Sequence, residues 1–180
     1  QRSIPVILFV DTFNRYYEPD NVRSAIKVLK KAGYFPFIPT LENSRKILCC
    51  GRTYLTNGLI NHAKNEVLNI LETYKPYLKN GISIVGLEPS CILSFRDEIP
   101  SLIKNEETDY LKNNSYTFEE LLSKHSEELK FKNLTKKVLL HGHCHQKAFD
   151  VVKPIENILK NIRGAKFETI ETSCCGMAGS

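Results

Sequence analysis

The chain has 180 residues, enough for one ordinary domain or two small ones with a hydrophobic core. Hydrophobic residues make up 42% and charged residues 25%, which is typical of a globular protein. No stretch approaches the roughly 18 apolar residues of a membrane span, so we expect no transmembrane segment. The net charge is +5, and the lysines are spread along predicted helices instead of forming one basic block. We therefore do not expect a nucleic-acid partner.

Strand and helix patterns alternate in the first part of the chain. An apolar run at 4–10 predicts a strand buried on both faces, and it ends in a polar turn that begins at Asp11. A helical pattern closed by Gly33 follows. The next strand, at 34–38, contains Pro36 and is therefore expected at a sheet edge.

The same alternation continues after a Cys49-Cys50-Gly51 triplet. Apolar spacing from Ala63 onward predicts a helix that stops near Pro76. A strand at 81–87 then leads into Glu88-Pro89-Ser90-Cys91. Strands joined by helices predict an α/β fold with parallel strands and crossover helices, with the cysteine motifs on loops at the carboxyl ends of strands.

The pattern restarts near the C-terminus. A strand at 136–140 leads to His141-Gly142-His143-Cys144-His145, a helix follows Pro154, and a strand at 167–171 leads to Cys174-Cys175-Gly176. We therefore predict two pseudo-repeated halves, at 1–100 and 136–180, the second truncated at its C-terminus. A charged helical connector at 101–135, with a loop at 113–115, joins them. The chain starts without Met, and we expect it to be part of a longer protein.

Two adjacent cysteines are poor disulfide partners, because their Cα atoms lie only about 3.8 Å apart. Thiols on a turn that ends in glycine are better suited to a thiophilic metal or cluster. Six cysteines without a secretory leader also favour metal or redox chemistry over a disulfide framework, and a cytoplasmic protein or one peripheral on the inner face of the membrane. Asp11 could supply one oxygen ligand or only form a turn. His143 and His145 could be ligands, proton carriers or hydrogen-bond partners of thiolates.

The two triplets, Glu88-Pro89-Ser90-Cys91 and the segment His141-Gly142-His143-Cys144-His145-Gln146-Lys147-Ala148 together resemble the cysteine-rich CCG domain. This family occurs in heterodisulfide reductase and in iron–sulfur subunits of glycolate oxidase, lactate-utilisation and anaerobic glycerol-3-phosphate dehydrogenase systems. The strongest resemblance is to the C-terminal region of FAD-linked oxidases that act on D-lactate, D-2-hydroxyglutarate or related 2-hydroxy acids and are fused to iron–sulfur modules.

The resemblance implies two CCG units that bind 4Fe–4S clusters, non-cubane in the best-understood relatives, or zinc in one half. The metal ligands that it implies are Cys49, Cys50, Cys91, Cys144, Cys174 and Cys175, with Gly51 and Gly176 completing the cofactor-binding turns. Asp11, Glu88, His143 and His145 are expected beside the cluster, where Glu88, His143 and His145 would adjust its potential through hydrogen bonds and charge. The first unit departs from the family, because Asp11 or Thr12 stands in place of its opening cysteine.

These features predict an electron-transfer region of an oxidoreductase, which relays electrons from a flavin to a quinone or another acceptor. The chain has no Gly-x-Gly-x-x-Gly loop, so we place the FAD in a partner domain or subunit outside it. The catalytic residues are unknown, and we do not expect the isolated chain to be an enzyme by itself. Two alternatives stay open: a thiol–disulfide redox enzyme that uses vicinal cysteines, and a structural zinc module that docks a partner.

Overall fold

The computed structural model describes residues 3–40, 47–125 and 129–172. The chain divides into two compact units, residues 1–118 and residues 119–180, which we call the N-terminal and C-terminal modules. The boundary falls within helix α8 (Phe118–Ser123). Cys174, Cys175 and Gly176, which we predicted as part of a metal site, lie outside the described residues.

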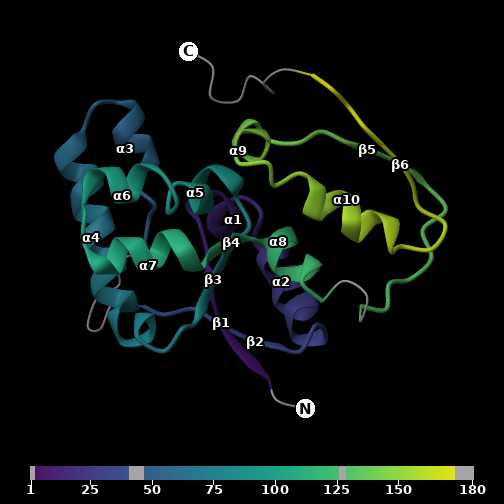
Figure 1. Ribbon diagram of the computed structural model, residues 1–180, viewed down its shortest axis with the longest axis horizontal. Coiled ribbons are helices and arrows are strands. Elements are labelled where there is room, and N and C mark those ends of the chain that lie inside the picture. Colours follow the sequence, from purple (N-terminus) through teal and green to yellow (C-terminus); the bar gives the residue numbers. More distant parts are fainter. Residues whose placement is uncertain (1–2, 41–46, 126–128, 173–180) are drawn as a thin grey trace. The chain divides into compact units, whose positions relative to one another are not determined.

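The N-terminal module is built on a four-stranded sheet with the order β2-β1-β3-β4, in which every neighbouring pair is parallel (Figure 1). The predicted α/β fold with parallel strands is therefore confirmed. The edge position of the second strand is also confirmed, because β2 pairs only with β1 among the described strands. The strands are β1 (Ile4–Phe9), β2 (Tyr34–Phe37), β3 (Ser83–Gly86) and β4 (Ser115–Thr117).

Helices connect these strands and bury the sheet. Val6, Ile7 and Leu8 of β1 are fully buried, as the continuous apolar run predicted, and α4 contributes Val67 and Ile70 to the same core. The helices of this module are α1 (Thr12–Tyr16), α2 (Pro19–Lys31), α3 (Arg52–Thr56), α4 (Ile60–Leu78), α5 (Pro89–Leu93), α6 (Glu98–Leu102) and α7 (Glu106–Asn114). Gly33 lies in the turn between α2 and β2. Its φ is +82°, a left-handed backbone conformation that favours glycine.

The helix predicted to stop near Pro76 is confirmed, since α4 ends at Leu78, two residues later. One expectation for this module is wrong: the loop at 113–115 is absent, because α7 reaches Asn114 and Ser115 begins β4. Ser115 pairs in register with Ile84 of β3, and its carbonyl accepts a hydrogen bond from Arg96 Nε at 2.8 Å. Long-range pairing therefore overrides the local turn signal.

The described part of the C-terminal module contains one parallel pair of strands, β5 (Lys137–Leu140) and β6 (Lys166–Thr169). They are joined by α9 (Cys144–Ala148) and α10 (Lys153–Lys160). Burial is much lower than in the N-terminal module, since both strands alternate between exposed and half-buried residues and α10 has no fully buried residue.

The two modules repeat one layout. The order β1-α1-α2-β2 in the first matches β5-α9-α10-β6 in the second, and each pair of strands is parallel. The short helices α1 and α9 have five residues each and begin at Thr12 and Cys144, respectively. The predicted pseudo-repeat of a parallel-strand half is confirmed in these elements.

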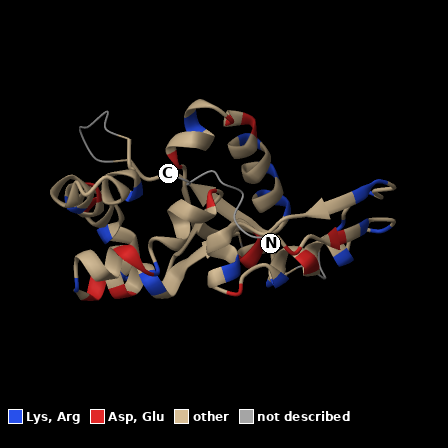
Figure 2. Cartoon of the chain, turned by 90° about the horizontal axis from the view of Figure 1, so that it is seen from above, with Lys and Arg blue, Asp and Glu red and all other residues tan. Residues whose placement is uncertain are grey.

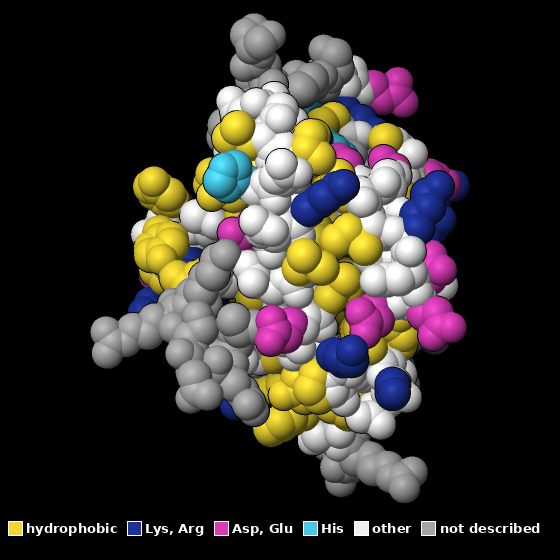
Figure 3. All heavy atoms as spheres, turned by 90° about the vertical axis from the view of Figure 1, so that its left-hand side faces the viewer, with side chains coloured by type: hydrophobic (Ala, Val, Ile, Leu, Met, Phe, Trp, Pro, Cys, Tyr) yellow, Lys and Arg dark blue, Asp and Glu magenta, His cyan; other side chains and the backbone are white. Residues whose placement is uncertain are grey.

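Charges of both signs are mixed on the outer helices. Lys and Arg lie among Asp and Glu along the helices, while the strands of the sheet are mostly uncharged (Figure 2). On the face shown in Figure 3, apolar side chains are likewise divided by charged ones. None of the helices in the described part of the chain is long and apolar enough to cross a membrane.

Candidate metal centre

Strands β1 and β3 are each followed by a five-residue helix whose first turn is held by an acidic side chain. Before α1, Asp11 Oδ1 accepts a hydrogen bond from the Asn14 backbone N–H at 3.0 Å, and Oδ2 accepts from Asn14 Nδ2 at 2.7 Å. Before α5, Glu88 Oε1 accepts from the backbone N–H of Ser90 at 3.2 Å and from its hydroxyl at 2.7 Å. Both acids are thus helix N-caps, which satisfy backbone donors that the helix itself leaves unpaired.

The same position after β5 is taken by a histidine. His143 Nδ1 accepts a hydrogen bond from the His145 backbone N–H at 3.2 Å. In return, the His143 backbone N–H donates to Gln146 Oε1 at 3.0 Å, which completes a capping box around α9. Asp11, Glu88 and His143, three of the four residues that we expected beside a cluster, therefore share one local role: each fixes the turn that carries a neighbouring motif residue.

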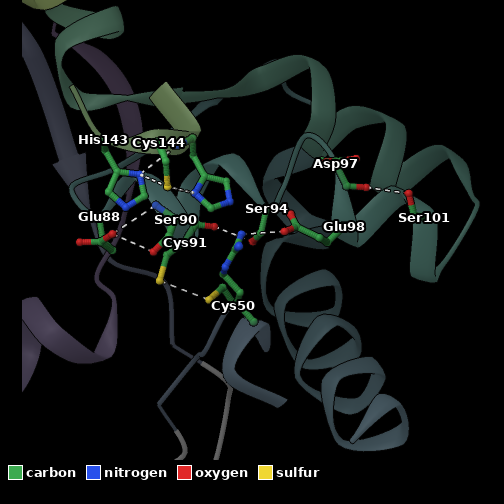
Figure 4. Close-up of polar contacts among 12 residues, drawn as sticks. Cys50, Glu88, Ser90, Cys91, Ser94, Asp97, Glu98, Ser101, His143 and Cys144 are labelled. Atoms are coloured by element: carbon green, nitrogen blue, oxygen red, sulfur yellow. Dashed lines mark hydrogen bonds and ion pairs between the residues drawn. The ribbon is translucent and has the colours of Figure 1, made fainter. Parts of the chain in front are cut away.

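Three thiols come together in the N-terminal module. Cys50 Sγ lies 3.2 Å from Cys91 Sγ, and both side chains are buried (Figure 4). Cys49 is half-buried beside them, and its sulfur accepts the Gly51 backbone N–H at 3.5 Å. Cys49, Cys50 and Cys91 are free thiols. Residues 41 positions apart in the sequence thus converge past the carboxyl ends of β2 and β3.

Gly51, the last residue of the first triplet, forms the backbone turn after the two cysteines. Its φ is +78°, and a Cβ added there would lie 3.1 Å from the carbonyl oxygen of Ala63 in α4. Both the left-handed conformation and the close approach require glycine. The next residue, Arg52, forms an ion pair with Glu98 of α6 at 2.6 Å, which links the triplet to the helices that follow Cys91.

Hydrogen bonds between the thiols and burial raise the pKa values of Cys49 and Cys50. The bond that Cys49 donates to Cys50 raises the pKa of Cys49 well above the usual thiol range, and burial raises it further. The same bond lowers the pKa of Cys50, but the bond to Cys91 and burial outweigh it and raise the pKa to about 12. Without a metal, Cys49 and Cys50 are therefore protonated at neutral pH.

In the C-terminal module, one thiol lies between two imidazoles. Cys144 Sγ is 3.6 Å from His145 Nδ1 and 3.8 Å from His143 Nδ1, and the two rings are stacked with centroids 5.2 Å apart. Their potential ligand atoms all lie within 4.8 Å of one another, so this cluster could hold a metal ion. His143 Nδ1 already accepts the His145 backbone N–H, so ligation through that atom would break the cap.

The repeat also shows where the first module differs from the second. Asp11 occupies the N-cap position that His143 has in α9, and Thr12 occupies the position of Cys144. The N-terminal module thus carries a hydroxyl where the C-terminal module carries a thiol. Both carboxylate oxygens of Asp11 are engaged within its own turn, which matches the turn-forming alternative for this residue.

Sequence reasoning did not single out two glycines that shape these turns. A Cβ at Gly86 would lie 2.6 Å from Ile92 Cβ, and one at Gly142 would lie 2.7 Å from Val152 Cγ2. Each glycine therefore lets the following segment pack directly against the end of its strand. Both glycines lie within two residues before a cap residue, Glu88 or His143, and this position was a signal in the sequence. The Arg52–Glu98 pair gave no such signal, because the two residues are far apart in the chain.

Comparison with known proteins shows relatives among dehydrogenases. The chain is 26% identical over 179 residues to a subunit of the anaerobic glycerol-3-phosphate dehydrogenase of Escherichia coli, a match that covers 97% of this chain and 44% of that protein. It is 25% identical over 183 residues to D-2-hydroxyglutarate dehydrogenase of Pantoea ananatis, covering 100% of this chain and 17% of that one. The chain thus spans less than half the length of these relatives. No known family profile matches it, and no solved structure matches it significantly.

The relatives confirm part of the resemblance seen in the sequence. Both kinds of protein belong to systems named there, and the chain is related to a region of dehydrogenases and of a dehydrogenase subunit. An oxidoreductase relationship is therefore established. Membership in the CCG family itself is not shown by these matches.

Proposed function

We propose that this chain is the iron–sulfur electron-transfer region of a flavin-dependent 2-hydroxyacid oxidoreductase and relays electrons from the flavin to a quinone or another acceptor. The observation that carries the proposal is the convergence of Cys49, Cys50 and Cys91 at one edge of the parallel sheet. The two kinds of dehydrogenase relative support the redox part of it.

The donor set fits a thiophilic centre. Two sulfurs that bind one metal at about 2.3 Å can be at most about 4.6 Å apart, and Cys50 Sγ and Cys91 Sγ lie within that limit at 3.2 Å. The surroundings are also suitable, because both thiols are buried and a soft metal can replace their protons. In this proposal Cys49, Cys50 and Cys91 hold a metal group in the first module, and Cys144, Cys174 and Cys175 hold one in the second.

A bound 4Fe–4S cluster, cubane or non-cubane, would supply one-electron redox chemistry, with zinc as an alternative occupant of one half. The chain's own residues position the thiols. Glu88 holds the first turn of α5, in which Cys91 lies, and His143 holds the turn that begins at Cys144. We assign to Glu88, His143 and His145 the further role of adjusting the potential through charge and hydrogen bonds.

The remaining parts of the proposal concern partners. FAD would be bound by another domain or subunit of the same oxidoreductase, and electrons would leave singly toward the acceptor. We place the protein in the cytoplasm or at the inner face of the membrane as a peripheral protein. We also propose the division into a first unit at 1–100, a connector at 101–135 and a second unit at 136–180.

One observation favours a second candidate, a thiol–disulfide redox enzyme. Cys50 and Cys91 are close enough to form a disulfide after a small movement. The raised pKa values of Cys49 and Cys50 argue against it, however, because the thiolate is the attacking form and these thiols stay protonated at neutral pH. Ligand thiols, in contrast, lose their protons when metal binds. Electron transfer is therefore the stronger candidate.

The deciding experiment is the iron, acid-labile sulfide and zinc content of anaerobically purified protein, for this chain and for its intact parent. Electron transfer predicts iron and sulfide in similar amounts and an optical spectrum that dithionite bleaches. Cys50→Ser and Cys91→Ser should each remove most of the iron of the first module, while Ser101→Ala on α6 should retain it. Zinc alone, without iron or sulfide, would instead support the structural zinc module.

The relay role needs its own test in the intact parent. Replacing Cys174 and Cys175 with Ser should abolish reduction of the acceptor but spare reduction of the flavin by substrate, because only the electron exit is broken. If both steps survive, the relay role is wrong. Metal-free protein that consumes a disulfide substrate would favour the thiol–disulfide enzyme.

A further inference from the structure

A cavity of about 230 Å³ lies within the N-terminal module, past the carboxyl ends of the neighbouring parallel strands β1 and β2. Its walls are mainly apolar and include Phe9, Val10, Ile38 and Leu48. In parallel α/β sheets, this edge is where ligands bind. None of the thiols that the structure describes is among the residues that line it, so the cavity is distinct from the candidate metal centre.

Among the described residues that line the cavity, one is cationic: Arg15 of α1. Arg15 Nε is buried and has no hydrogen-bond partner in the part of the chain that the structure describes. A buried guanidinium donor without a partner is costly, because the group has lost water without regaining a hydrogen bond. Tyr74 of α4 also lines the cavity, and burial raises the pKa of its hydroxyl, which therefore remains a donor at neutral pH.

The repeat supplies an independent comparison. Lys147 occupies in α9 the position that Arg15 has in α1, and it too lines a cavity past the ends of its strands, beside Gly142 and Thr172. In the C-terminal module the chain itself supplies an acceptor for this cation, because Lys147 Nζ donates to the Thr172 carbonyl oxygen at 2.6 Å. The same location thus carries a cation in both modules, and Arg15 Nε in the first has no such acceptor among the described residues.

We propose that the N-terminal cavity is a binding site for a small monocarboxylate with an apolar body of about one ring. The carboxylate accepts from the Arg15 guanidinium, which is charged at all relevant pH values. The apolar body packs against the walls formed by Phe9, Val10 and Leu48. Its size follows from the volume: a cavity of about 150 Å³ holds benzene, so 230 Å³ accommodates a ring with a carboxylate attached.

The site is independent of the proposed electron transfer, which assigns the oxidised substrate to a flavin domain outside this chain. Leu48 and Ile47 line the cavity and directly precede Cys49, so a bound carboxylate would lie beside the segment that leads to the thiols without replacing any of them. The test therefore uses metal-free, reduced chain, and its failure leaves the electron-transfer proposal untouched.

Benzoate is the probe, titrated into the ¹⁵N-labelled full chain while the backbone amide signals of Val10, Thr40 and Leu48 are followed. We expect saturable shifts at these amides. Benzamide, which lacks the charge, and acetate, which lacks the ring, should each bind about tenfold more weakly or worse. Arg15→Gln should weaken benzoate binding by about tenfold or more, and Arg15→Lys by less. Arg23→Gln, an exposed arginine of α2, is the matched control and should leave binding unchanged.

Three results would overturn the site. The first is the absence of saturable amide shifts up to about 10 mM benzoate, a concentration that would nearly saturate a site with a Kd of about 1 mM. The second is unchanged binding by Arg15→Gln. The third, decisive even if circular dichroism shows that Arg15→Gln does not fold, is equal affinity of the wild-type chain for benzoate and benzamide.

Discussion

The two modules share one layout of strands and helices but differ greatly in how deeply their strands are buried. In the N-terminal module, β1 lies between β2 and β3; Ile4 and Pro5 at its start are exposed, and the other four residues, Val6–Phe9, are buried. In the C-terminal module, the described sheet has two strands that alternate between exposed and half-buried positions. The five-residue helix and its N-cap are nevertheless present in both. The local turn is therefore set by the cap and its partners, and the depth of the core is a separate property.

Comparing the two modules also distinguishes the residues that form the turn from the residues that could bind a metal. Asp11 and His143 hold equivalent turns with different side chains, so the cap requires a hydrogen-bond acceptor and not a particular residue. Thr12 and Cys144 follow them, and only the second carries a thiol. The modules thus differ in potential ligands at a position where the backbone is the same.

The largest expected contrast lies in the cores. Ile84→Ala in β3 removes a fully buried side chain and should lower the free energy of unfolding by about 2–5 kcal/mol. Leu139→Ala in β5 removes a side chain that is 60% exposed and should change it by less than about 0.5 kcal/mol. Urea unfolding followed by circular dichroism measures both. Equal losses in the two variants would contradict the unequal burial of the modules.

The next contrast concerns the turn after the first cysteine pair. Gly51→Ala adds a Cβ at a φ of +78° and only 3.1 Å from the Ala63 carbonyl oxygen, so strain and a steric clash combine. We expect a loss of about 2 kcal/mol or more in stability, together with weaker metal binding through displaced thiols. Gly33→Ala is the matched control: its φ is +82° but its Cβ would meet nothing within 4 Å, so only about 1 kcal/mol is expected. Equal losses would show that the approach to α4 is unimportant.

The sequence was sufficient for the parts of this picture that depend on local pattern. The continuous apolar run before Asp11 predicted a buried strand, and Pro36 predicted the sheet edge. The repeated motifs predicted a repeated layout. Strand β4 could not be predicted in the same way, because three residues carry no reliable period and Ser115 is held there by partners distant in the chain.

For the candidate site, the sequence indicated which residue types matter but not how they are held. The cysteine spacing gave no information on the 3.2 Å approach of Cys50 to Cys91, which depends on the packing of two loops. Glu88 and Asp11 were expected beside a cluster, and the structure shows that their oxygens are engaged in helix caps. A cap and a metal neighbour have similar sequence signatures, because both use a polar residue directly after a strand.

The thiols of the N-terminal module make the stability of the metal-free protein depend on pH. The raised pKa of Cys50, about 12, means that the folded chain holds this proton more tightly than the unfolded chain does. The resulting stability is fully present below the ordinary thiol pKa and is lost as pH rises toward 12. We expect Cys50 to contribute a loss of roughly 1 kcal/mol by pH 10, measured as a falling thermal midpoint under anaerobic conditions. Cys50→Ser should reduce this slope; an unchanged slope would show that another group causes it.

The smallest expected contrast compares two ion pairs. Arg52 and Glu98 are 23% and 29% exposed, lie 2.6 Å apart and join the triplet to α6, whereas the pair of Lys137 with Glu168 lies on the exposed surface of the β5–β6 sheet. Glu98→Gln should cost about 0.5–1 kcal/mol, because a half-buried charge loses its partner while the bonded geometry is nearly kept.

Glu168→Gln should leave the thermal midpoint unchanged within error. Lys137 lowers the pKa of Glu168, but solvent screens a pair so exposed. Salt provides the sharper test, since about 0.5 M NaCl should leave the cost of Glu98→Gln largely intact if burial shields the pair. If salt abolishes the stability cost of Glu98→Gln, the Arg52–Glu98 pair behaves as a surface pair, like Lys137–Glu168. The position of the triplet would then depend on Gly51 and its contact with α4 instead.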